Sequence, residues 1–120
     1  MLTNEDRKQI LNSVLDTVEC ISDKEYQKRV WIDGKGPEVD DFDETCCFFF
    51  GDVDPLLLRY RDFGLSKSQY LILQKLRNEF RIFSDNYDHP CEFICSPEWE
   101  QIMKIAKQVL HEFDYKKNRN

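Results

Sequence analysis

The feature that most constrains the fold is an apolar pattern with helical spacing in the second half of the chain. Leu73, Leu76 and Phe80 recur every three or four residues, which places them along one face of a helix. Ser66 and Gln69 precede the stripe at the spacing of a capping box, in which each side chain bonds the other residue's backbone amide. The sequence therefore predicts a long amphipathic helix here.

Four other segments carry helix signals. Residues 3–21 and 96–113 combine a Thr or Ser cap with apolar residues at helical spacing. A shorter helix is predicted after a capping signature at 22–25. Asp54-Pro55 is expected to begin a further helix, because Asp can cap a helix and Pro is tolerated at its first position, and Gly64 is expected to end it.

Three segments are less regular. The apolar run Cys46–Phe50 is too short for its period to separate a buried strand from part of a buried helix, so both remain open. We expect its cysteines and phenylalanines to anchor this segment in the core. The segment after the turn at 84–86, through Ile94, is expected to be a loop or short strand, and the tail at 114–120 is expected to fray.

Length and composition fit one domain. A chain of 120 residues with 41% hydrophobic residues can bury one core. The expected fold is mainly α: a compact single-domain helical bundle over residues 1–120, in which one or two short strands survive, with an α+β fold as the alternative. Because the sequence has neither a signal-peptide pattern nor an apolar run of about 18 residues, we expect a cytoplasmic protein without membrane contact.

The residue pattern indicates a protein that is not an enzyme. The net charge of -6 disfavours direct nucleic-acid binding, which needs clustered Lys and Arg. His89, Cys91 and Cys95 lack the paired spacing of a zinc site, and the loop from Asp33 to Glu44 lacks the central glycine of a calcium loop. The five cysteines are expected to be reduced. We therefore expect no catalytic residues, no metal and no cofactor.

An acidic stretch is the strongest functional signal. Between Gly36 and Arg59 the sequence holds seven carboxylates and no Lys or Arg. Carboxylates this close repel one another, and a basic partner relieves the repulsion. A solvated acidic loop is the plain alternative. The candidate protein-contact residues are the apolar anchor Trp31 and the acidic side chains Asp33, Glu38, Asp40, Asp41, Asp43, Glu44, Asp52 and Asp54.

The order of motifs in the middle half of the chain resembles a known family. The motifs are Trp31, Gly36-Pro37, Asp40-Asp41-Phe42-Asp43-Glu44, Phe49-Phe50, Leu57 with Tyr60, Phe63-Gly64-Leu65-Ser66, Gln69-Tyr70 and Leu73. Together they resemble the immunity proteins of bacterial contact-dependent growth inhibition systems that are paired with ribonuclease toxins. The resemblance implies a cytosolic antidote that binds the toxin domain and neutralises it without catalysis. Our hypothesis from the charge density is that the acidic residues cover a basic ribonuclease active site. The acidic contact residues are inferred from charge density in this sequence and not from the family.

A second hypothesis belongs to another class. The same acidic and apolar surface would suit a non-catalytic helical adaptor or regulatory subunit of a larger assembly. The sequence leaves the oligomeric state open. Adjacency of the gene to a large toxin gene would distinguish the antidote from the adaptor.

Overall fold

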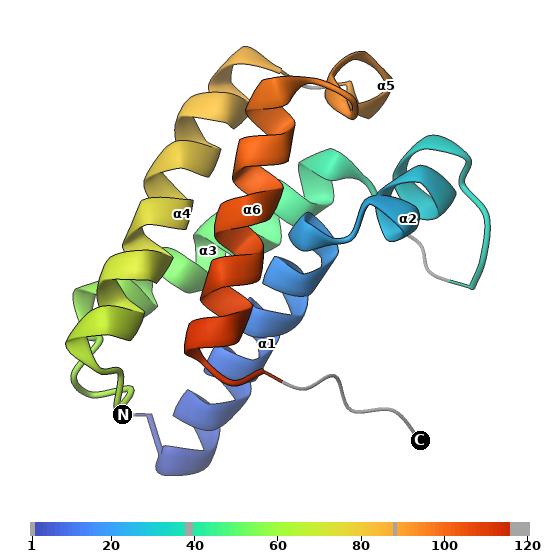
Figure 1. Ribbon diagram of the computed structural model, residues 1–120. Helices are drawn as coiled ribbons and strands as arrows, with labels where there is room; N and C mark the ends of the chain where they lie inside the picture. Colours follow the sequence, from blue (N-terminus) through green and yellow to red (C-terminus); the bar gives the residue numbers. More distant parts are fainter. Residues whose placement is uncertain (1, 38–39, 88, 116–120) are drawn as a thin grey trace.

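The computed structural model describes residues 2–37, 40–87 and 89–115 (Figure 1). These ranges form helices and turns and contain no strand, so the predicted mainly α bundle is confirmed and the short strands do not form there. The Cα radius of gyration is 14.2 Å. This value is close to the roughly 13.6 Å expected for one compact domain of this length.

In the described ranges, four long helices build the bundle and three short elements cover one end of it. Each long helix packs against two others: α1 against α3 and α6, and α4 against α6 and α3. In Figure 1, α4 and α6 lie side by side in front of α3. The groove between α1 and α3 is therefore diagonally opposite the groove between α4 and α6. The elements are α1 (Asn4–Ser22), α2 (Lys24–Tyr26), the π-helix η1 (Gln27–Ile32), α3 (Phe42–Leu58), α4 (Lys67–Asn86), α5 (Pro90–Phe93) and α6 (Pro97–Glu112).

The starts of α1, α4 and α6 follow the predicted caps, whereas the start of α2 does not. Thr3 and Ser66 each form a full capping box, and the Ser96 hydroxyl accepts a bond from the Trp99 amide at 3.1 Å. The cap of α2 is Asp23, whose carboxylate accepts from the Tyr26 amide at 3.1 Å, whereas Ser22 is the last residue of α1 and its hydroxyl donates to the Glu19 carbonyl. The predicted start at residue 22 is wrong by one position.

The region from residue 42 to residue 58 is one helix and not a run followed by a new helix. Cys46–Phe50 lies inside α3, which settles the open alternative in favour of helix. Pro55 falls in the last turns of α3, so the expected helix start at Asp54-Pro55 is wrong. Pro55 has no backbone N–H, so the Gly51 carbonyl lacks the hydrogen bond that residue 55 would otherwise donate to it. Gly51 is exposed, so water can donate that bond. Gly64, with φ of 75°, closes the turn after α3.

The C-terminal end of α6 has a Schellman motif. The Asp114 amide donates to the His111 carbonyl at 3.1 Å and the Tyr115 amide to the Leu110 carbonyl at 2.9 Å. Asp114 has φ of 50°, the left-handed conformation that this motif requires. Tyr115 packs on the core, and its hydroxyl donates to Asp16 at 2.6 Å. The predicted frayed tail is therefore wrong for residues 114 and 115, and residues 116–120 lie outside the described ranges.

Aromatic rings fill the end of the core beneath the short elements. The rings of Phe42 and Phe93 are 4.9 Å apart, as are those of Phe93 and Trp99. Phe93 belongs to a helical turn, α5, where a loop or strand was expected. Fully buried Gln27 ties three elements together: its amide donates to the Cys20 and Ile21 carbonyls, and its oxygen accepts from the Trp99 indole at 2.9 Å.

Candidate protein-binding site

The apolar run in α3 is divided between the core and the surface. Phe49 is fully buried, whereas its neighbour Phe48 is 64% exposed. Adjacent helical residues point about 100° apart, so a continuous apolar run cannot face the core along its whole length. The expectation that all the phenylalanines anchor the core is wrong for Phe48, and Cys47 is exposed as well.

Phe48 stands at the edge of an acidic groove between α1 and α3. The groove has a volume of about 370 Å³. No Lys or Arg occurs among the described residues that line it. Its lining consists of Ser13, Asp16, Thr17 and Cys20 from α1, Asp40 from the preceding segment, and Glu44, Thr45 and Phe48 from α3.

Asp40 is held by bonds within the protein. Its Oδ2 accepts from the Tyr26 hydroxyl at 2.8 Å and from the Trp31 indole at 3.1 Å, and both of its oxygens accept from the Thr45 hydroxyl. Burial, and after it the bond to Asp40, raises the pKa of Tyr26 well above its ordinary value. Asp40 therefore joins η1 to α3 and adds its negative charge to the groove from a fixed position.

Three other predicted residues also have structural partners. Asp41 caps α3 by accepting from the Glu44 amide at 2.8 Å. Asp54 forms a two-bond ion pair with Arg77 of α4, at 2.8 and 3.3 Å, on the opposite side of α3 from the groove. Asp52 accepts from the Ser13 hydroxyl at 3.3 Å and so joins α3 to the groove-lining side of α1.

The remaining predicted residues lie away from the groove or outside the described ranges. Trp31 is only 9% exposed and packs edge-on to Phe42, so it cannot serve as an exposed anchor. Asp33 is exposed at the end of η1, and Asp43 is exposed on α3 outside the groove lining. Glu38 lies outside the described residues.

The sequence prediction missed the contribution of α1 to this site. Ser13, Asp16 and Thr17 recur at three- and four-residue spacing on the polar face of the first predicted helix. That pattern marks a shared face but does not say which helix lies beside it. The anchor Phe48 could have been separated from Phe49 by helical phase, once the segment was taken as a helix.

The groove is suited to binding by charge and apolar contact. Its exposed carboxylates, Asp16 and Glu44, line the same groove as the exposed ring of Phe48, which combines charge with an apolar anchor. In the described part of the chain, no group of three or more His, Cys, Asp or Glu side chains is placed to hold a metal ion. No helix in the described ranges is both long and apolar enough to cross a bilayer.

Comparisons with known proteins give no relative for this chain: no family model matches it, and neither a curated protein nor a solved structure is significantly similar.

Proposed function

We propose that the protein is a non-catalytic antidote that binds a basic ribonuclease toxin domain through the groove between α1 and α3. The observation that carries the proposal is the 64% exposed Phe48 in a groove with carboxylates, where the described lining residues include no Lys or Arg. A ribonuclease holds RNA phosphates with cationic side chains, and an acidic surface competes for the same positions. That the partner is a ribonuclease toxin, and that the protein acts in the cytoplasm, are parts of this proposal that rest on the family resemblance.

The two kinds of residue in the groove have different roles in the proposed complex. Glu44 and Asp16 are exposed and attract the basic partner, which raises the association rate at low salt. Phe48 becomes buried on binding and slows dissociation. Full burial of a Phe side chain is worth about 1.5–3 kcal/mol, so Phe48→Ala is expected to weaken binding roughly 10- to 100-fold. Asp40 sets the position of the acidic rim without needing to move.

The test uses the purified protein and the toxin domain encoded beside its gene. A stoichiometric amount of the protein is expected to abolish RNA cleavage, and cleavage that persists in excess protein contradicts the proposed function. Glu44→Lys and Phe48→Ala are expected to weaken inhibition. Their controls are Asp62→Lys, which makes the same change of charge, and Leu58→Ala, which also truncates a large apolar side chain, both at exposed positions outside the groove. If inhibition occurs but each variant matches its control, the antidote function stands and the site is wrong.

A second candidate function is an adaptor in a larger assembly. It is favoured by exposed apolar side chains on a different face: Leu71 is 51% and Ile82 62% exposed, both on α4. An adaptor needs two separate contact faces, whereas an antidote needs one. Absence of a toxin gene beside this gene, together with capture of two partners at once, would favour the adaptor.

A further inference from the structure

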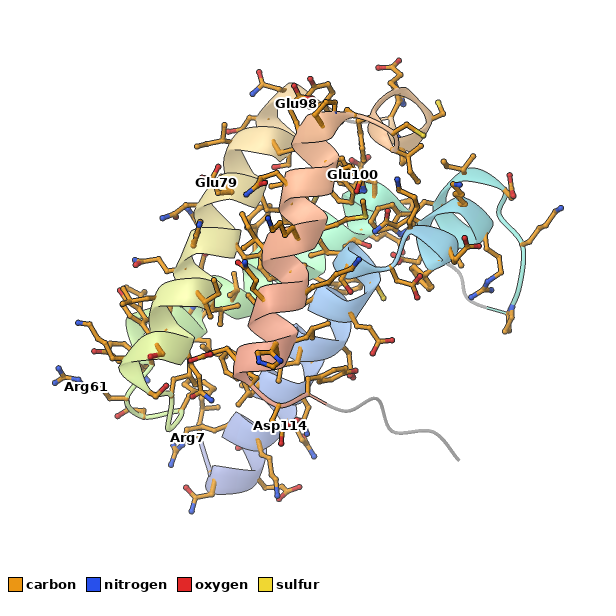
Figure 2. All side chains as sticks on the ribbon, in the orientation of Figure 1. Arg7, Arg61, Glu79, Glu98, Glu100 and Asp114 are labelled. Carbon is orange, nitrogen blue, oxygen red and sulfur yellow. The ribbon has the colours of Figure 1, made fainter. Side chains whose placement is uncertain are left out.

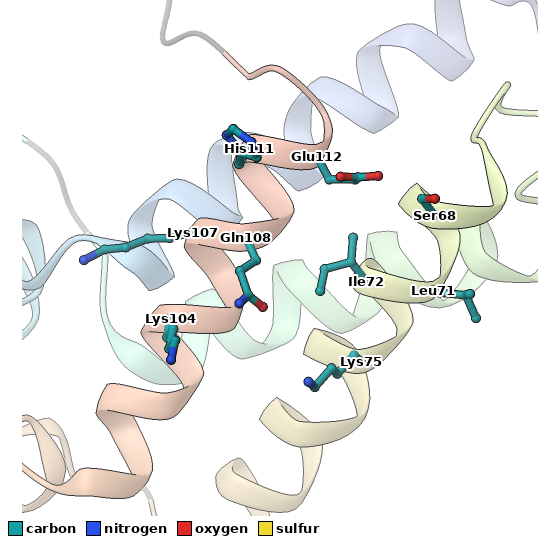
Figure 3. A pocket seen from close by; sticks show the side chains of 9 residues that line it. All are labelled: Ser68, Leu71, Ile72, Lys75, Lys104, Lys107, Gln108, His111 and Glu112. Atoms are coloured by element: carbon teal, nitrogen blue, oxygen red, sulfur yellow. The ribbon is translucent and has the colours of Figure 1, made fainter.

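The outer face of α4 and α6 has a charge pattern that reverses along its length. One half of the face, shown in Figure 3, is lined by Lys75, Lys104 and Lys107, and Glu112 is the one carboxylate among its described lining residues. The other half is lined by Glu79 and Glu98, which Figure 2 shows on α4 and at the start of α6. Among the described residues that line this second half there is no Lys or Arg.

Apolar side chains are arranged in both halves of the same face. Ile72 is half-buried in the basic half, and Ile82 is 62% exposed in the acidic half. Figure 3 shows Ile72 directed into the space between α4 and α6. On α4 the order along the helix is Ile72, Lys75, Glu79, Ile82, which places an apolar residue, a cation, an anion and an apolar residue around a midpoint at residue 77.

We infer that this face binds a second copy of the same chain, with the two α4 helices antiparallel. A two-fold axis that crosses α4 at residue 77 brings position i against position 154 minus i of the partner copy. Lys75 then meets the partner's Glu79, Glu79 meets the partner's Lys75, and each Ile72 meets an Ile82. A parallel arrangement would place the basic halves together, so charge selects the antiparallel one.

The size of the face sets the strength of this contact. The 20 residues of α4 span roughly 30 Å, and two packed helices are about 20 Å wide, so each copy covers on the order of 600 Å². The total of about 1,200 Å² is at the lower limit for specific interfaces. The dimer is therefore weak, with a dissociation constant on the order of 10–100 µM.

The arrangement leaves the acidic groove accessible. The α1–α3 groove is diagonally opposite the α4–α6 face, so each copy in the dimer presents its groove outward. The dimer is thus bivalent and does not depend on what the groove binds. Lys104 lies next to the middle of the face, because it lines the basic half while Gln101 and Ile102 line the acidic half. Lys104 of one copy is therefore close to Lys104 of the other copy across the axis, and repulsion between the two positive charges opposes dimerisation.

Sedimentation velocity of the full chain, from about 5 to 500 µM, tests the inference. The wild type is expected to pass from monomer to dimer, and a monomer over the whole range overturns the proposal. Lys75→Glu and Glu79→Lys each place like charges across the axis and should weaken the dimer at least about 10-fold. The double variant Lys75→Glu with Glu79→Lys restores both pairs and should recover the wild-type constant.

Two further variants test the geometry separately from the charges. Lys104→Gln is expected to tighten the dimer by removing repulsion near the axis, whereas Glu25→Gln, on an exposed position of α2, should leave it unchanged. These positions are on the surface, and circular dichroism checks that each variant is folded. If the single charge reversals leave the dissociation constant of the dimer unchanged, the interface lies elsewhere. If the double variant dimerises no more tightly than the single variants, the antiparallel axis is refuted.

Discussion

Replacement of Gln27 by Leu tests whether a buried polar side chain holds one end of the bundle together. The change removes two bonds to backbone carbonyls, at 3.0 and 2.8 Å, and the bond from the Trp99 indole at 2.9 Å. The Cys20 carbonyl still accepts a bond from the Asp23 amide, so it stays hydrogen-bonded in the variant. The Ile21 carbonyl and the Trp99 indole each lose the bond to Gln27. A buried group left without its partner costs about 1–3 kcal/mol, so we expect a loss of about 3 kcal/mol in the free energy of unfolding.

Urea and thermal unfolding, followed by circular dichroism, measure this loss. A decrease of about 3 kcal/mol corresponds to a melting temperature lower by about 12 °C for a chain of this size. Gln9→Leu, at an exposed position of α1, is the matched control and should change stability by less than about 0.5 kcal/mol. Trp99→Phe, made with and without Gln27→Leu, isolates the indole bond. A Gln27→Leu protein as stable as the control, or additive effects in this cycle, would refute the reasoning.

Three other predictions concern single positions. Gly51→Ala should stabilise the protein by about 0.5–1 kcal/mol in urea unfolding, because Gly51 lies in the middle of α3 and an added Cβ meets no described atom within 4 Å beyond its chain neighbours and the adjoining helix backbone. Asp114→Gly should stabilise it by about 1 kcal/mol, because Asp114 holds a left-handed conformation that glycine adopts without cost. Burial, and after it the charge of Asp43, raises the pKa of the Cys46 thiol to about 12, so iodoacetamide at pH 8 should label exposed Cys47 and spare Cys46. The stabilising effect of the neutral Cys46 thiol is complete below its ordinary pKa of 9.0 and is lost as the pH rises toward 12, which unfolding of a Cys46→Ala variant across that range would show.

Local signals predicted most of the fold because they need only neighbouring residues. The caps at Thr3, Ser66 and Ser96 each accept from the amide three positions ahead, so short sequence patterns contain the whole interaction. Asp54-Pro55 was predicted to begin a helix, but Pro55 lies near the C-terminal end of α3. A proline there removes one backbone hydrogen bond, which water can replace, so the helix continues through it. The dipeptide alone does not distinguish these two positions. Residues 42–58 form the single helix α3, which packs against both α1 and α4. These contacts are between distant parts of the chain, so local signals do not predict them.

The candidate site was predicted less completely because charge density does not say which carboxylates have partners. Asp54 lies 23 positions from Arg77 and Asp40 lies 14 positions from Tyr26, so neither pairing follows from local spacing. Both residues were predicted as surface contacts, yet both are bonded within the fold. Asp16 was missed for the same reason, because the groove forms only when α1 lies beside α3.

The bonds of Asp40 have a consequence for how related chains can change. Its carboxylate fastens η1 to α3 through three donors, so a substitution there alters the fold before it alters recognition. Glu44 and Phe48 line the same groove from exposed positions, and their side chains do not join elements of the fold in this way. Mutational drift in homologues should therefore leave position 40 fixed while positions 44 and 48 diverge, so that a lineage acquires new specificities on an unchanged scaffold.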